Sequence, residues 1–140
     1  MTDDAAGPRS DDAGREFDAD VRREPHGPIE PGIHEASGPA DAVVAELRAA
    51  GWRVGVVDGP ESRSDALDSI GEALDFPAWY GRNLDALWDC LTDLRKPTAL
   101  VWARWSRLAL RRPDDWARVL EVLTDRTLEA PAFAVVFTGD

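Results

Sequence analysis

The sequence predicts an α/β protein built on a parallel sheet. Three segments rich in Val, Leu, Trp and Phe have the length and composition of strands, at 52–57, 98–102 and 133–137. Segments with apolar residues at helical spacing lie between them. Because strands that alternate with helices are joined by crossovers, we expect parallel strands with right-handed connections.

Two helices are expected around the first strand. One covers 41–50 and ends where Gly51 supplies the glycine that commonly follows a helix. The other begins at a cap formed by Ser64 or Asp65 and stops at Phe76-Pro77. Both therefore have a start or stop signal in addition to an apolar face.

The last helix leads into the third strand. Pro113 fits its first helical position, and two aspartates follow in the first turn, where the helix dipole favours acids. Its inner face is expected to hold four apolar residues, Trp116, Val119, Leu120 and Leu123.

Residues 1–39 are expected to form a disordered acidic arm rich in Pro and Gly. Residues 1–40 hold ten Asp or Glu and four Arg, a net charge of −6 (4 − 10), with five Gly and five Pro. Such a segment buries too little apolar surface to offset the entropy of ordering it. The folded domain should then span 40–140. His26 and His34 lie in the arm, without residues that would give them a metal or catalytic role.

The segment from Tyr80 to Thr92 is the most informative part of the chain. Asn83 is suited to cap a helix, because its side chain can accept from a free N–H of the first turn. Four residues then follow at i, i+3, i+4 and i+7 and predict one buried face: Leu84, Leu87, Trp88 and Leu91. Cys90 points away from that face and is expected to be partly exposed.

Two aspartates lie on a neighbouring stripe of the same helix. Asp85 and Asp89 are one turn apart, and like charges at this spacing cost roughly 0.2–0.5 kcal/mol. The helix dipole offsets this cost for Asp85, which is in the first turn, but not for Asp89. No Lys or Arg stands at 86, 92 or 93. Two carboxylates on one helix stripe without a neighbouring Lys or Arg favour a positively charged partner.

The same segment closely resembles the signature of the barstar family, intracellular inhibitors of the small secreted ribonuclease barnase. The similarity runs without a gap over 83–92 and more weakly over about 52–140. It implies a two-layer fold with a three-stranded parallel sheet in the order 1-2-3, to which the helix at 41–50 is an addition. It also implies a cytoplasmic, immunity-protein or antitoxin-like inhibitor of a barnase-like ribonuclease, whose acids mimic RNA phosphates.

The resemblance implies nuclease contacts for eight residues. Asp89 would enter the nuclease active site in place of an RNA phosphate, and Asp85 would meet basic residues at its rim. The remaining expected contacts are Trp79 as an aromatic anchor, Asn83 and Thr92 as hydrogen-bonding groups, Trp88, Asp93 and Asp125. Three positions depart from the family pattern and bear on which nuclease is bound. Asp125 stands where Glu is common, and Asp93 and Leu94 replace a small residue and an aromatic.

Charge narrows the class of partner. The chain has 16 Lys or Arg and 27 Asp or Glu, a net charge of −11. Binding nucleic acid directly needs a basic face, so we expect no nucleic-acid ligand. An acidic chain suits a basic protein partner, although many acidic proteins have no such role. Opposite charges can speed the association of two proteins, and barnase with barstar is the standard example. The expected size of this acceleration is therefore taken from the resemblance. With no apolar segment long enough for a membrane span or secretory signal, we expect a cytoplasmic monomer when free.

No enzyme, metal or cofactor site is expected. Asp85 and Asp89 have no nearby His or enclosed pocket that would separate their pKa values for acid–base chemistry. Cys90, the only cysteine, can form neither an internal disulfide nor a metal cluster. A ribonuclease inhibitor is therefore the leading prediction. One alternative is a protein-interaction module on the same fold whose partner is not a nuclease, and another is a small enzyme of unknown chemistry.

Overall fold

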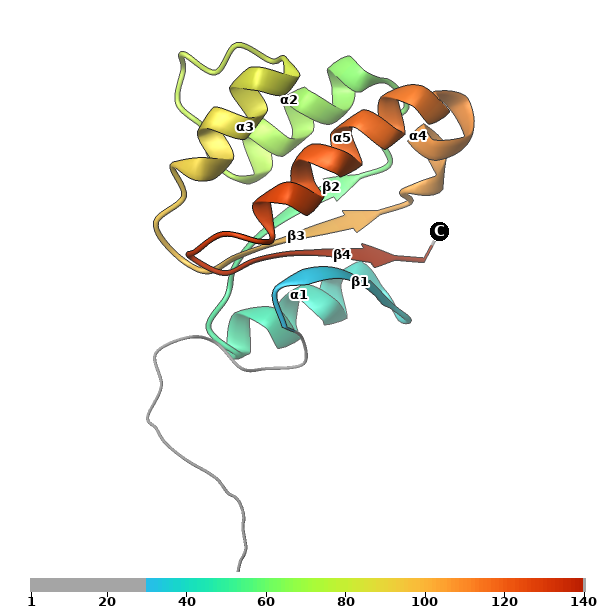
Figure 1. Ribbon diagram of the computed structural model, residues 1–140. Coiled ribbons are helices and arrows are strands. Elements are labelled where there is room, and N and C mark those ends of the chain that lie inside the picture. The colour runs from blue at the N-terminus through green and yellow to red at the C-terminus, as the bar shows by residue number, and fades with distance from the viewer. Residues whose placement is uncertain (1–29, 140) are drawn as a thin grey trace, which may run out of the picture.

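The computed structural model describes residues 30–139, whose centre is a sheet of four parallel strands (Figure 1). In chain order the strands are β1 (Gly32–Ala36), β2 (Arg53–Asp58), β3 (Thr98–Ala103) and β4 (Phe133–Thr138). They lie in the order β1-β4-β3-β2, and every neighbouring pair is parallel. The parallel α/β architecture is confirmed, and the three predicted strands β2, β3 and β4 are adjacent in the predicted order.

Helices cover both faces of the sheet. Four of them lie on one face, α2 (Arg63–Ala73), α3 (Leu84–Thr92), α4 (Ser106–Arg111) and α5 (Pro113–Arg126), and α1 (Ala40–Ala49) lies on the other (Figure 1). On β3, Leu100 and Trp102 pack with the four helices, whereas Ala99 and Val101 pack with α1. The predicted two-layer arrangement is therefore wrong. The apolar face of α1 needs a sheet face of its own, which makes three layers.

The fourth strand, β1, corrects the prediction of three strands and of a disordered segment through residue 39. Gly32–Ala36 pairs along its length with β4 at the edge of the sheet. An edge strand needs main-chain hydrogen bonds more than apolar side chains, and β1 alternates half-buried and exposed positions. The composition of Gly32–Ala36 therefore does not identify this segment as a strand. His34 lies on this strand, whereas His26 and the rest of 1–29 lie outside the described residues.

The helix boundaries mostly follow the local signals. α1 nearly coincides with the predicted 41–50, α3 begins directly after the predicted cap Asn83, and α5 begins at Pro113 as predicted. The predicted cap of α2 is wrong, because Ser62 is the cap and its Oγ accepts from the Asp65 N–H at 3.0 Å. α4 was not anticipated. Within residues 30–139, no helix combines the length and apolar character that crossing a membrane requires.

Candidate functional site

Helix α3 and its two capping residues, Asn83 and Asp93, carry six of the eight predicted contacts, and the sequence of α3 explains how it folds. Asn83 Oδ1 accepts a hydrogen bond from the Ala86 N–H at 2.7 Å, so the predicted cap is confirmed. Leu87 and Leu91 are fully buried in the core cluster that α3 shares with α2, α5 and the sheet. One face of α3 is thus fixed by packing, while other side chains remain on the surface.

Two side chains of α3 differ from prediction. Trp88 is half-buried and lies outside the core cluster, whereas Cys90 is 2% exposed. The buried face is rotated toward Cys90, which lies near Leu74, Phe76 and Leu94. Burial raises the pKa of the Cys90 thiol, and the nearby carboxylates of Asp93 and Asp89 raise it further.

The loop ahead of α3 is fastened to α2 by Tyr80. Its hydroxyl donates to the Leu67 carbonyl at 3.1 Å, and its ring meets the Phe76 ring edge-on at 5.0 Å. α2 has Gly71 at this contact, where a Cβ would come within 2.8 Å of the Tyr80 ring. Trp79, directly before Tyr80 in the same loop, is 61% exposed. The predicted aromatic anchor therefore stands on the surface, on a loop held by its neighbour.

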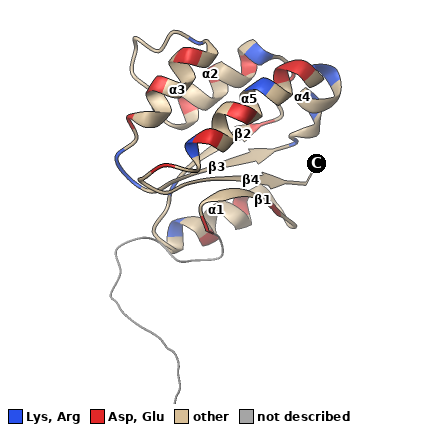
Figure 2. Cartoon of the chain, in the orientation of Figure 1, with Lys and Arg blue, Asp and Glu red and all other residues tan. Residues whose placement is uncertain are grey.

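Asp85 and Asp89 are exposed carboxylates. No Lys, Arg or His among residues 30–139 forms an ion pair with either one. Figure 2 shows acidic positions on α3 and no basic ones. The like charges one turn apart therefore have no ion-pair partner in the described part of the chain, and the helix dipole favours only Asp85.

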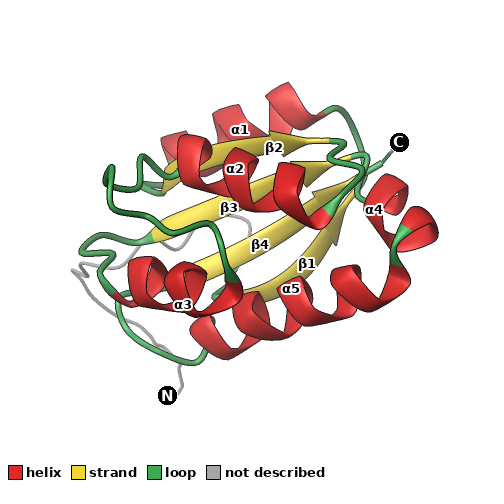
Figure 3. Ribbon diagram, turned by 90° about the horizontal axis from the view of Figure 1, so that it is seen from above, coloured by secondary structure: helices red, strands yellow, loops and turns green. Residues whose placement is uncertain are grey.

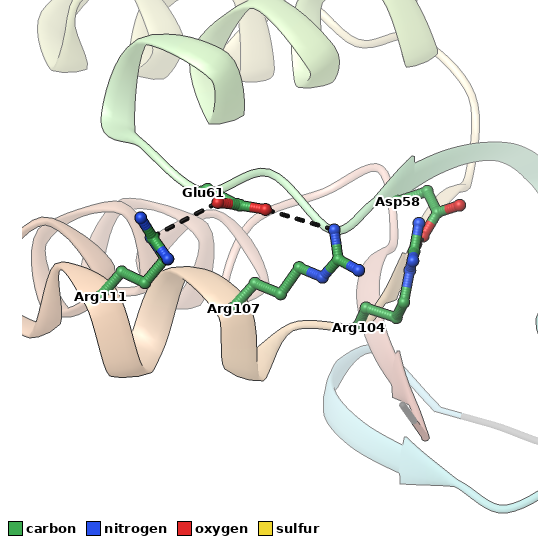
Figure 4. Close-up of polar contacts among 5 residues, drawn as sticks. All are labelled: Asp58, Glu61, Arg104, Arg107 and Arg111. Carbon is green, nitrogen blue, oxygen red and sulfur yellow. Dashed lines mark hydrogen bonds and ion pairs between the residues drawn. The ribbon is translucent and has the colours of Figure 1, made fainter.

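Acids near the carboxyl ends of β2 and β3 contrast with those of α3. Asp58 accepts from Arg104 Nε at 2.7 Å, and Glu61 lies between Arg107 and Arg111 at 3.3 and 3.4 Å (Figure 4). These acids are paired with arginines, whereas Asp85 and Asp89 have no ion pair among residues 30–139. Other exposed acids of the described residues, such as Glu46 and Glu121, are also unpaired, so α3 is marked by having two unpaired acids one turn apart on one helix.

Asn83 and Thr92 present opposite hydrogen-bonding groups at the two ends of α3. Capping occupies Asn83 Oδ1, which leaves the Nδ2 amide as a donor to solvent. The Thr92 hydroxyl donates to the Asp89 carbonyl at 2.9 Å, so its oxygen remains as an acceptor. A donor and an acceptor thus flank the two carboxylates.

α5 brings two more charged residues to the end of α3, beside which it lies (Figure 3). Asp125 is exposed, whereas the next residue, Arg126, is 1% exposed and its Nε donates to the Leu91 carbonyl at 2.8 Å. The sequence analysis missed Arg126. A signal was present, because Arg126 completes an i, i+4, i+7 stripe with the buried Val119 and Leu123.

The two departures from the family pattern after α3 have different consequences. Leu94 is 6% exposed and belongs to the core cluster, so this difference lies inside the fold. Asp93 is the exposed C-cap residue of α3 and adds a third carboxylate close to Asp89. Only the change at Asp93 alters the exposed surface.

The chemistry offered by this surface is the binding of positive charge. Its carboxylates belong to Asp85, Asp89 and Asp93 on and after α3 and to Asp125 on α5. Within the described part of the chain, no group of three or more His, Cys, Asp or Glu is arranged to hold a metal ion. Exposed carboxylates, together with the exposed Trp79 of the preceding loop, are groups that can complement a basic protein surface.

Comparison with known proteins agrees with the resemblance seen in the sequence. The family model described as Barstar (barnase inhibitor) matches residues 53–138, from β2 to the end of β4. A Bacillus subtilis (strain 168) protein named "Putative ribonuclease inhibitor YrdF" is 51% identical over 39 residues, which cover 26% of this chain and 43% of that relative. The alignment thus spans less than half of the curated relative. Because the family model matches more than half of the chain, this protein belongs to the barstar family.

Proposed function

We propose that this protein inhibits a basic, secreted or toxin ribonuclease of the barnase type by covering its active site with α3. The observation that carries the proposal is the exposed, unpaired pair Asp85 and Asp89 on a helix whose other face is fixed in the core. Family membership and the name of the Bacillus relative support it.

Asp89 is proposed to take the place of an RNA phosphate. Ribonucleases hold phosphates with Arg and Lys side chains, and a carboxylate offers those donors the same sign of charge and the same kind of acceptor. Asp89 projects from within α3, whose backbone is already ordered, so little conformational entropy is lost on binding. Asp85, one turn earlier, would meet cations at the rim of the active site.

The other proposed contacts surround the two acids. The exposed ring of Trp79 is suited to be an apolar anchor, because large aromatics dominate many interface cores. The Asn83 amide would donate to the nuclease, and the Thr92 oxygen would accept from one of its basic side chains. The last three contacts would come from Trp88, Asp93 and Asp125, so the surface extends from α3 onto α5.

A blocking complex of this kind needs no catalysis, cofactor or metal. We place its action in the cytoplasm of the cell that makes the nuclease, where it would protect cellular RNA before export. This is an immunity or antitoxin-like role, performed by a protein that is monomeric when free.

The test titrates the protein into a barnase-family ribonuclease that cleaves a fluorogenic RNA. Asp89→Asn keeps the shape and removes the charge, and it should weaken inhibition by about 3 kcal/mol, roughly two orders of magnitude. Glu46→Gln removes the same charge from an exposed position of α1, across the sheet, and should change inhibition by less than about threefold. Equal inhibition by Asp89→Asn and the parent protein would contradict phosphate mimicry.

The association rate gives a second test. It should fall steeply between about 0.01 and 0.5 M salt, as the Debye length shrinks from about 30 Å to under about 5 Å. A rate that stays flat would argue against charge steering. Capture of a protein other than a nuclease through Asp85 and Asp89, without ribonuclease inhibition, would favour the interaction-module alternative.

A further inference from the structure

Arg126 is a buried charged residue that the proposed contacts leave unused. Its Nε donates to the Leu91 carbonyl and its Nη1 to the Glu129 carbonyl, both at 2.8 Å. Its guanidinium carbon lies 5.6 Å from the centre of the Phe133 ring. One side chain on α5 therefore joins the last turn of α3, the loop after α5 and strand β4.

The contact with Leu91 adds a charged donor at the C-terminal end of α3. The last carbonyls of a helix lack partners within the helix. Here the Asp89 carbonyl accepts from the Thr92 hydroxyl, the Cys90 carbonyl from the Asp93 N–H, and the Leu91 carbonyl from the Leu94 N–H at 3.2 Å, so Arg126 Nε is a second and shorter donor to Leu91. α3 has no basic residue in its last turn, so Arg126 supplies from another helix the positive charge that favours a helix C-terminus.

Arginine is well suited to this position. Arg126 is 1% exposed, and no carboxylate among residues 30–139 forms an ion pair with it. Burying a charge without an ion pair is costly, and its hydrogen bonds to two carbonyls offset part of the loss of hydration, while Nη2 is buried with no hydrogen-bond partner among residues 30–139. The planar guanidinium reaches both carbonyls at once in a fixed geometry, which the single ammonium of a lysine cannot reproduce.

We propose that Arg126 is a positioning residue for the inhibitory surface. Its hydrogen bond to the Leu91 carbonyl, which we call the clamp, holds the last turn of α3 against α5 and thereby sets the spacing between Asp89 and Asp125. Each end of this clamp lies within two residues of one of these acids, since Leu91 follows Asp89 by two positions and Arg126 follows Asp125 directly. The inference rests on the proposed function, because the spacing matters only to a partner that both acids contact.

A fixed spacing has a measurable consequence. A nuclease surface presents cations at set positions, so two acids on separate helices act together only if the helices are held together before binding. Asp89 and Asp125 should therefore be coupled through Arg126. Loosening the clamp should reduce what Asp125 adds to binding, even where the protein remains folded.

The test compares Arg126→Lys and Arg126→Gln with Arg118→Gln, which removes an exposed arginine from the same helix. Folding is first checked by circular dichroism at low temperature. Hydrogen exchange then follows the amides of 93–94, which bond to carbonyls at the end of α3, against amides in β3. Inhibition of a barnase-family ribonuclease is measured for each variant with and without Asp125→Asn.

We expect exchange at 93–94 to rise by about tenfold or more in Arg126→Lys while β3 changes much less, and Arg118→Gln should leave both unchanged. Asp125→Asn should weaken inhibition by about tenfold in the parent but by less than about threefold in Arg126→Lys. Equal effects of Asp125→Asn in the two backgrounds, or equal exchange increases at 93–94 and in β3, would overturn the positioning role. If Arg126→Gln does not fold, Arg126→Lys, which keeps the charge, decides the result.

The two proposals can fail separately. A parent protein that inhibits no ribonuclease would refute the proposed function, and with it the coupling of Asp89 and Asp125. Hydrogen exchange needs no nuclease. It would still show whether Arg126 holds α3 to α5.

Discussion

Asn83 has two roles that substitution can separate, because its oxygen caps α3 and its amide is a proposed donor to the nuclease. Asn83→Ala removes the 2.7 Å hydrogen bond to the Ala86 N–H. Loss of a cap of this kind costs about 1 kcal/mol, within a range of roughly 0.5–2 kcal/mol. Asn83 is exposed, so no cavity adds to this cost. For a domain of this size, about 1 kcal/mol corresponds to a fall of about 4 °C in Tm.

Asn83→Asp keeps the accepting oxygen and adds a negative charge at the helix N-terminus. The helix dipole favours that charge by about 0.3–1 kcal/mol, and Asp85, two positions away, does not face it directly. The free protein should therefore be as stable as the parent or slightly more so. Both variants lose the amide donor. Asn83→Ala should therefore weaken inhibition by about fivefold, the value of one hydrogen bond, whereas in Asn83→Asp the added negative charge should offset part of this loss against a basic nuclease.

Urea unfolding followed by tryptophan fluorescence measures the first effect, and titration against a barnase-family ribonuclease measures the second. The reasoning about the cap is refuted if Asn83→Ala is as stable as the parent, or if Asn83→Asp is the less stable of the two variants. Full inhibition by Asn83→Ala would remove the amide from the proposed contacts.

Three further results are expected. Gly71→Ala should destabilise the protein by about 1–3 kcal/mol in urea unfolding, because its Cβ would come within 2.8 Å of the Tyr80 ring; an unchanged midpoint would show that the ring has room to move. Deletion of 1–38 should lower Tm by several degrees relative to deletion of 1–29, which keeps β1, and equal Tm values would show that β1 contributes little. Burial raises the pKa of the Cys90 thiol, so the unfolded chain loses this proton first as pH rises. The free energy of unfolding should then decline above about pH 8.5, less steeply in Cys90→Ala, and identical slopes would contradict this.

Much of α3 could be predicted from sequence because its determinants are local. A capping residue, an apolar spacing and a missing basic neighbour all lie within thirteen residues, from Tyr80 to Thr92. The strands β3 and β4 were equally readable, since continuous apolar runs are typical of strands covered on both faces. Trp88 and Cys90 were assigned to the wrong environments because the rotation of α3 depends on what packs against it.

The remaining features depend on residues that are distant in the chain. β1 is a strand because β4 offers it a backbone edge, and nothing in the composition of Gly32–Ala36 signals that pairing. Arg126 bonds to a carbonyl 35 residues away on α3. Periodicity could place Arg126 on the inner face of α5, but only the packed structure identifies the group that receives it.

The central claim is that Asp89 occupies a phosphate position in a ribonuclease active site. The most direct measurement is the affinity of the protein for a barnase-family ribonuclease in the presence of a nucleoside monophosphate bound in that site. The account predicts exclusive binding, with the apparent Kd of the protein rising in proportion to nucleotide once the site is filled, and the same competition for Glu46→Gln. A ternary complex in which the protein binds the nucleotide-loaded ribonuclease with undiminished affinity would contradict it.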